Sequence, residues 1–423
     1  MAANKKTGDS LESLKTLVKS AVELISQLET FLHSNAVDVN VHNASQNSDP
    51  SSSPLSSPLS SPLSSPLSSP PSSKSSTTIN PVDPLALAHD SAALIKAHTT
   101  KLSLLIINEP FTPSAITKVL RELVAGPIPS LASAVQFCDV QKYTTVARQD
   151  LSWRCYRVLK ELKSFIAIIP LDGKVLPNEQ RNGSSGGKGS MAATGVIWAA
   201  CDDVILLKKL GIAGLLVKKV EEYRDTLNDI LEELKEYSEE VGEEDDGDDD
   251  DDNDENEDDE DGEVDESGGD IDDITDQVQN THLSTQQMLD DLMVPRHIPR
   301  NDPDKIRERL ESCMKRLRLT TLLYTAIVKR RLKTLPPFPN ATQAPIPQRL
   351  DEVYPLLKIL PHRFGEVACA FYELDRDSID LAMDSCFFDA FAASEMLMKP
   401  WEGDRDEFTD WAEKFQVGIK KPD

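Results

Sequence analysis

The sequence lacks the residue patterns of most catalytic and metal sites. Its six cysteines include no C-x-x-C pair, and its seven histidines include no H-x-x-x-H pair and no cysteine at ligand spacing. The sequence also contains no nucleophile elbow and no glycine-rich dinucleotide turn. We therefore expect no enzymatic activity, no cofactor, and no catalytic, cofactor-binding or metal-binding residues.

Long apolar runs and strand-like alternation are also missing. No run of about 18 apolar residues exists, which argues against a membrane-spanning helix. The first residues lead into an amphipathic helix rather than a signal-peptide apolar region. The scattered cysteines lie mostly in apolar helical patterns, which is typical of reduced, buried thiols in a cytosolic or nuclear protein. Apolar residues recur at helical spacing throughout, so the predicted fold class is all-α, with antiparallel multi-helix bundles in two helical halves.

One short tract carries most of the net charge. The 423 residues sum to −27, but residues 239–266 alone hold 21 Asp and Glu and no Lys or Arg, which leaves −6 for the rest. Self-repulsion and the near absence of apolar residues predict that this tract does not fold by itself. We expect a disordered acidic insert over residues 241–295.

A second low-complexity stretch repeats Ser-Ser-Pro-Leu with a period of four residues. Proline at every fourth position forbids helix and sheet, so residues 36–83 are predicted to form a disordered, polyproline-like linker. One interpretation is a spacer that grew by duplication. The other is a cluster of proline-directed phosphorylation sites at the serines that precede prolines, namely Ser53, Ser57, Ser61, Ser65 and Ser69.

The remaining chain divides into three predicted helical parts. Residues 1–35 form an amphipathic helix that packs on the bundle, 84–240 form a first helical bundle region, and 296–420 form a second. Within these parts we expect helices over about 10–33, 84–108, 112–123, 130–141, 143–168, 192–210, 214–240, 303–335, 349–374, 377–398 and 404–416.

The helix predicted over 214–240 has a heptad seam. Apolar residues recur at alternating spacings of four and three, at Leu216, Val220, Tyr223, Leu227, Ile230, Leu234 and Tyr237. Val217 and Leu231 widen the stripe, which favours a helix buried in a multi-helix bundle. The alternative is an intermolecular coiled coil, but a parallel homodimer would set Lys219 against Arg224 of its partner.

The segment just before this helix carries a resemblance to a known family. Gly195, Val196, Ile197, Trp198, Ala199, Ala200, Cys201 and Asp202 resemble the V-W-x-A-C segment of the cyclin-D-interacting protein (GCIP) family. The leucine-rich helix that follows and the order of helical halves around an acidic insert also resemble this family. We place Trp198 and Cys201 on one helical stripe with Ile205, and a tryptophan in such a stripe is more often core than contact.

The resemblance implies a non-enzymatic regulator of the nucleus and cytoplasm. Such helix-loop-helix and leucine-zipper-like proteins bind D-type cyclins or helix-loop-helix factors and restrain the cell cycle or transcription. No catalytic or ligand residues carry over. Gly195, Trp198, Cys201 and Asp202 are marked as the family-hallmark segment, which we expect to lie in the core. The oligomeric state stays open.

Three other functions compete with this one. The acidic tract is also typical of a chaperone for histones or other basic proteins. Residues 305–333 hold ten Lys and Arg and only two Glu, which suggests nucleic-acid binding, although a solvated basic face is the commoner meaning. The helix lengths also fit a vinculin- or talin-like scaffold.

Overall fold

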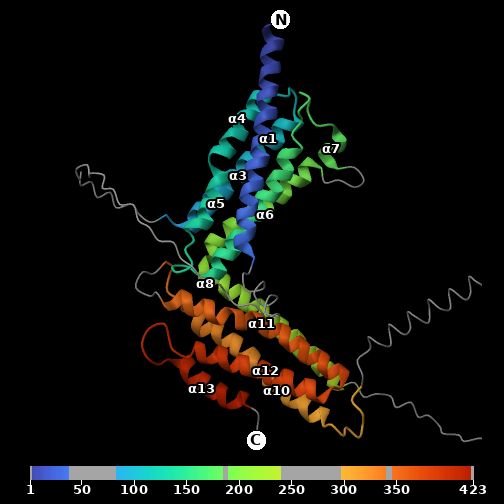
Figure 1. The fold of residues 1–423 in the computed structure, drawn as a ribbon, viewed down its shortest axis with the longest axis vertical. Coiled ribbons are helices and arrows are strands. Elements are labelled where there is room, and N and C mark those ends of the chain that lie inside the picture. The colour runs from blue at the N-terminus through green and yellow to red at the C-terminus, as the bar shows by residue number, and fades with distance from the viewer. Residues whose placement is uncertain (1, 38–81, 184–188, 240–296, 340–344, 421–423) are drawn as a thin grey trace, which may run out of the picture. The chain divides into compact units, whose positions relative to one another are not determined.

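The fold is all-α, as the sequence predicts. A computed structural model describes residues 2–37, 82–183, 189–239, 297–339 and 345–420, and every regular element among these residues is helical (Figure 1). The phosphorylation candidates, most of the predicted linker and the whole of the acidic insert over residues 241–295 lie outside the described residues. No described helix combines the length and the apolarity that crossing a membrane requires.

The chain packs as two compact units. The first comprises residues 1–218 and 332–352, and the second comprises 219–331 and 353–423. Two long helices, α8 (Ser190–Glu239) and α11 (Pro345–Glu373), contribute to both units. The sequence places the whole of α8 in one predicted region, residues 84–240. Which parts of the chain fold independently stays a prediction.

The first unit is a bundle built around α1. Its helices are α1 (Ala2–Ala36), α3 (Pro84–Ile107), α4 (Pro113–Ala125), α5 (Pro127–Phe137), α6 (Thr145–Ala167), α7 (Asn178–Asn182) and the first part of α8. In Figure 1, α1 runs alongside α6, and it also packs on α4 and α5. The apolar face of α1 is buried at every fourth or third position from Leu14 to Leu32.

Polar groups at several positions fix α1 against α6. The Ser152 hydroxyl donates to the Leu32 carbonyl at 2.7 Å, and Arg148 donates to the Asn35 side chain at 2.8 Å. Lys163 pairs with the largely buried Glu29. The N-terminal helix therefore buries its apolar face within this chain.

Side-chain caps begin two helices of the first unit, α3 and α6, close to the starts that the sequence predicts. Asp83 accepts a hydrogen bond from the Leu85 amide at 3.0 Å, and Thr144 accepts one from Ala147 at 3.0 Å. Two other helices of this unit begin earlier than predicted. α1 begins at Ala2 rather than near residue 10, and α5 begins at Pro127 rather than near residue 130. Prolines fit the first helical positions of α5, where no amide donor is needed.

A glycine interrupts α8 where the sequence predicts a break. Gly211 has φ 64° and ψ −177°, a conformation that essentially only glycine adopts without strain. The helix therefore consists of two parts, 190–210 and 212–239, with a kink between them. The first carries the hallmark segment, and the second carries the heptad seam.

The second unit combines the heptad helix with the C-terminal helices. These are α10 (Ile306–Ile327), the π-helical turn η1 (Val328–Leu332), α11, α12 (Arg376–Met396) and α13 (Glu407–Ile419). Two prolines lie inside α11. Pro361 has no amide to offer the Leu357 carbonyl, and the Tyr324 hydroxyl of α10 donates to that oxygen at 2.7 Å. The helix therefore continues through Pro361 without leaving this buried carbonyl unpaired.

Candidate interaction surfaces

The hallmark segment lies in the first part of α8, which packs on α3 and α6. The Thr194 hydroxyl donates to Ser103 of α3 at 3.1 Å. Asp202 pairs with Lys96 of α3 at 2.6 Å, and the next residue, Asp203, pairs with Arg157 of α6 at 2.8 Å. Two consecutive aspartates therefore link α8 to a different neighbour on each side.

The structure separates the two residues that the sequence analysis placed on one buried stripe. The buried line of α8 runs through Ile197, Ala200, Cys201, Val204 and Leu207. Trp198 lies about 100° around the helix from Ile197 and is 39% exposed. The expectation that Trp198 and Cys201 share one buried face is therefore wrong, because the neighbouring helices cover a stripe one residue away from the predicted one.

The expectation of a buried hallmark segment is correct only for Cys201. The other three residues form an exposed surface, which we call the α8 outer face. Gly195, Trp198 and Asp202 lie at i, i+3 and i+7, and all three are exposed. A Cβ at Gly195 would have no atom within 4 Å, so the space one turn before the indole is open. The Lys96 ammonium lies 6.0 Å from the centre of the Trp198 ring. The outer face thus offers an apolar ring beside a charged pair.

The cysteine of this segment has no exposed chemistry. Cys201 is fully buried, and desolvation by burial raises the pKa of its thiol to about 12. A thiol with such a pKa is protonated at neutral pH and is neither a nucleophile nor a metal ligand. Among the described residues, no group of three or more His, Cys, Asp or Glu is placed to hold a metal ion.

The heptad seam is buried. Leu216, Val220, Leu227, Ile230 and Leu234 are all at most 9% exposed, and Tyr223 is half-buried. In the second unit, the hydroxyls of Tyr223 and Tyr354 of α11 lie 2.7 Å apart, and Tyr237 donates to the Phe371 carbonyl at 3.1 Å. The seam therefore packs against this chain and presents no continuous apolar surface to a partner.

The basic segment 305–333 uses its arginines to hold the second unit together. Arg316 is buried and donates to the Ile419 carbonyl at 2.8 Å, at the end of α13. Arg331 is 1% exposed and donates to the carbonyls of Leu397 and Met398, at the end of α12, at 2.7 and 3.0 Å. Cations at helix C-termini satisfy the last carbonyls and complement the helix dipole.

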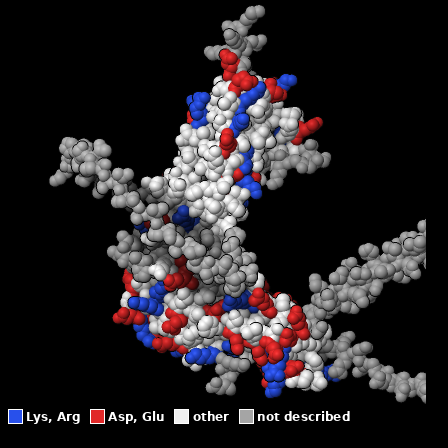
Figure 2. Space-filling view, viewed as in Figure 1, with Lys and Arg blue, Asp and Glu red and all other residues white. Residues whose placement is uncertain are grey.

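Acidic partners take up further arginines of this segment. Arg331 also pairs with Asp406 at 2.6 Å, and Arg309 pairs with Asp380 at 3.0 Å. Figure 2 shows Lys and Arg interspersed with Asp and Glu over the helices of the second unit. Because these arginines are paired, we do not expect the segment to provide a continuous basic surface for phosphates. The sequence alone does not reveal the acceptors of these arginines, which lie far away along the chain.

Comparisons with known proteins agree with the sequence resemblance. Residues 88–240 match the family model described as Grap2 and cyclin-D-interacting, N-terminal. The chain is also similar to an uncharacterised protein of Schizosaccharomyces pombe, with 26% identity over 153 residues. That match covers 36% of this chain and 44% of the yeast protein.

The family match begins within α3 and ends at the C-terminus of α8. It therefore includes both the α8 outer face and the heptad seam. The C-terminal helices α10 to α13 lie outside it. The resemblance to the cyclin-D-interacting family is confirmed over residues 88–240, where the chain matches the family model.

Proposed function

We propose that this chain is a non-enzymatic regulator that binds a cyclin or a helix-loop-helix factor and thereby restrains cell-cycle progression or transcription, in the nucleus and the cytoplasm. The observation that carries the proposal is the match of residues 88–240 to a family named for its interaction with cyclin D. The match spans less than half of the chain, so the partner itself is part of the proposal.

The α8 outer face is the docking surface that this function requires. Tryptophan is enriched among the residues that dominate binding energy, because a large, rigid ring loses much exposed area at little cost in side-chain entropy. Trp198 is 39% exposed, and Gly195 one turn earlier leaves room for a partner's backbone to approach. The Lys96–Asp202 pair beside the ring supplies a charged rim.

The heptad seam is excluded from this role in our proposal. Its side chains are buried against this chain's own helices, so a zipper contact with a partner would require the second unit to open. Binding through α8 instead uses residues that are already exposed. This assigns helix-mediated binding to the first part of α8 rather than to the second.

A binding titration with purified partners tests the proposal. Isothermal calorimetry of the full chain against a D-type cyclin, and separately against a helix-loop-helix factor, should show binding to at least one of them. Trp198→Ala should weaken that binding about thirtyfold, since interface hot spots contribute about 2 kcal/mol or more.

Trp153→Ala is the matched control. Trp153 is 49% exposed, lies on α6 within the same family match, and stacks on Tyr156 rather than on α8. Its removal should leave the affinity within about twofold of the wild type. Failure of the wild-type chain to bind either partner would refute the function. Equal losses in the two variants would refute the assignment of the α8 outer face.

A further inference from the structure

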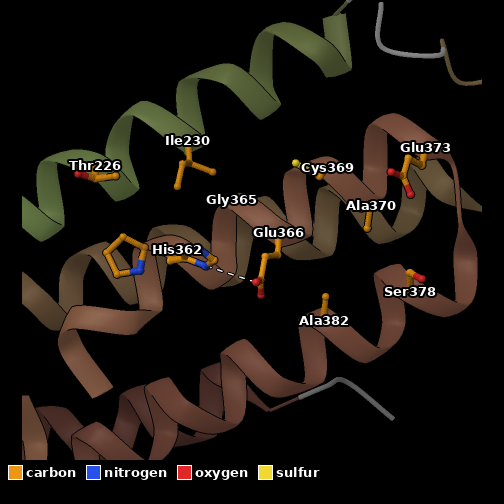
Figure 3. Close-up of a pocket in the computed structure, with 11 residues that line it drawn as sticks. Thr226, Ile230, His362, Gly365, Glu366, Cys369, Ala370, Glu373, Ser378 and Ala382 are labelled. Atoms are coloured by element: carbon orange, nitrogen blue, oxygen red, sulfur yellow. Dashed lines mark ion pairs between the residues drawn. The ribbon is translucent and has the colours of Figure 1, made fainter. Parts of the chain in front are cut away.

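The second unit contains an apolar groove that is separate from the α8 outer face. It has a volume of about 850 Å³ and is lined by residues of α8, α11 and α12 (Figure 3). Residues from three helices line it, among them Thr226 and Ile230 from α8, Gly365, Cys369 and Ala370 from α11, and Ala382 from α12. Its volume falls within the range of about 300–1,000 Å³ that is usual for binding pockets.

Small side chains on α11 and α12 create the groove. Figure 3 shows α11 between α8 and α12, with Gly365, Cys369 and Ala370 facing the open space. A Cβ at Gly365 would have no atom within 4 Å, so the α11 backbone is accessible there. Another backbone can approach closely at such a position. The side chains of a partner helix can therefore reach the α11 backbone at Gly365.

Carboxylates surround this apolar floor. Glu366 and Glu373 line the groove on α11. Asp229 and Glu233, both exposed, lie three residues after Thr226 and Ile230, on the same side of α8. His362 pairs with Glu366 at 3.3 Å, and the Tyr372 hydroxyl donates to Glu233 at 2.8 Å, so two of these four carboxylates also have partners within the chain.

The negative charge continues past the end of α8. The helix ends at Glu239, where the tract of 21 Asp and Glu over residues 239–266 begins. A field of one sign attracts ligands of the opposite sign and speeds their association. It also disfavours occupation of the groove by this acidic tract. A second copy of the chain would bring the same acidic α8 surface, so like charges oppose that occupant too.

We propose that the groove binds an amphipathic α-helix of a partner protein, with apolar side chains directed at α11 and lysines or arginines along its edges. Helix-in-groove recognition uses apolar anchors at i, i+3 or i+4 and i+7, which suit an elongated apolar floor between two helices. The basic edges pair with the carboxylates of α8 and α11. This site goes beyond the proposed function, because it uses other residues and needs no cyclin.

A model peptide tests this proposal on the full chain. The probe is a fluorescein-labelled amphipathic helix of leucine and lysine, about 18 residues or five turns long. Its affinity is measured by fluorescence anisotropy at about 0.15 M salt, where charges beyond roughly 8 Å are screened. A second peptide with serine in place of leucine retains the charge and lacks the anchors. The wild type should bind the leucine peptide at least tenfold more tightly than the serine peptide.

Gly365→Leu separates groove binding from attraction to the acidic tract. The new side chain fills the floor without a clash at Cβ and replaces a helical glycine with a strong helix former, so the variant should stay folded. Its affinity for the leucine peptide should fall at least tenfold, with no decrease in melting temperature. Glu366→Gln with Glu373→Gln should weaken binding and reduce its salt dependence, whereas Glu402→Gln, in the loop after α12, should change neither.

Cys369 provides a second readout inside the groove. It is exposed, and the other five cysteines are buried, so a maleimide reports selectively on this thiol. The leucine peptide should slow alkylation of Cys369 at least tenfold at saturating concentration. Equal peptide affinity for wild type and Gly365→Leu, or no protection of Cys369, would overturn the proposal, because binding would then reside in the acidic tract.

Discussion

At the scale of single residues, Arg331 shows how a residue of the basic segment 305–333 stabilises the fold instead of binding a ligand. Its side chain is buried, and the guanidinium contacts two carbonyls at the end of α12 and the carboxylate of Asp406. The ring of Phe408 lies 4.2 Å from the guanidinium carbon. Arg331 therefore joins η1, α12 and α13 through one side chain.

Replacing Arg331 should destabilise the second unit strongly. In Arg331→Met, the Leu397 carbonyl and Asp406 lose the hydrogen bonds from the guanidinium, and loss of one partner of a buried ion pair costs about 3–5 kcal/mol. Because Asp406 is partly exposed, we expect about 3 kcal/mol in the free energy of unfolding, measured by urea denaturation. Lys329→Met, at an exposed position two residues earlier, should change it by less than about 0.5 kcal/mol. Similar losses in both variants would contradict this role.

Asp406 predicts a specific acid sensitivity. Hydrogen bonds from Arg331 are the main cause that lowers the pKa of Asp406 to about 2, below the ordinary value near 3.9. Its contribution to stability is complete above about pH 4 and is lost as the pH falls through about 2. The melting temperature of Asp406→Asn should therefore approach that of the wild type between pH 4 and pH 2. A gap between the two that stays constant over this range would contradict the pairing.

At the scale of elements, the two parts of α8 behave oppositely toward their neighbours. The first part leaves Trp198 exposed on its outer face, whereas the second buries its seam. Periodicity predicted both helices and the glycine break between them. It did not predict which side of the first part would be covered, because a stripe shifted by one residue also reads as helical, and only the positions of α3 and α6 decide between them.

Two glycines in α8 should respond to alanine in opposite directions. Gly211 has φ 64° and ψ −177°, so Gly211→Ala should lower the free energy of unfolding by about 1–3 kcal/mol. Gly195 has helical backbone angles and open space around its Cβ position, so Gly195→Ala should raise it by up to about 1 kcal/mol. Chemical denaturation measures both. If both substitutions changed the free energy of unfolding in the same direction, the fold would not depend on the positive φ of Gly211.

The heptad helix should tolerate no charge on its seam. Leu227 is fully buried, so Leu227→Asp places a carboxylate in an apolar core and should unfold the second unit. Thr226→Asp introduces the same side chain at the adjacent, exposed position and should change the free energy of unfolding by about 0.5 kcal/mol or less. Circular dichroism and urea titration distinguish them. A folded Leu227→Asp variant that loses partner binding would restore the coiled-coil interpretation.

At the scale of the whole molecule, the sequence predicted the fold class better than it predicted the candidate sites. Helical spacing, proline positions and caps such as Asp83 are local properties, and they predicted nearly every helix. The arginine acceptors at the ends of α12 and α13 lie 66 to 103 residues away from their donors along the chain. No local pattern signals such pairs, nor the groove that small residues on α11 leave between α8 and α12.

Both proposed binding surfaces lie on helices that pack against other helices of their unit. The α8 outer face presents Trp198 from a helix fixed to α3 and α6 by Asp202 and Asp203. The groove of the second unit has its floor on α11 and its acidic rim on α8 and α11. Both surfaces exist before any partner arrives, so binding needs little reorganisation of the described helices.

Hydrogen exchange of the full chain, with and without a purified D-type cyclin, tests the central claim most directly. The first part of α8 should exchange more slowly in the complex, with protection centred on residues 195–202, because a partner covers that face and suppresses local opening of the helix. Unchanged exchange over this segment in a chain saturated with cyclin would contradict the assignment of the α8 outer face as the docking surface.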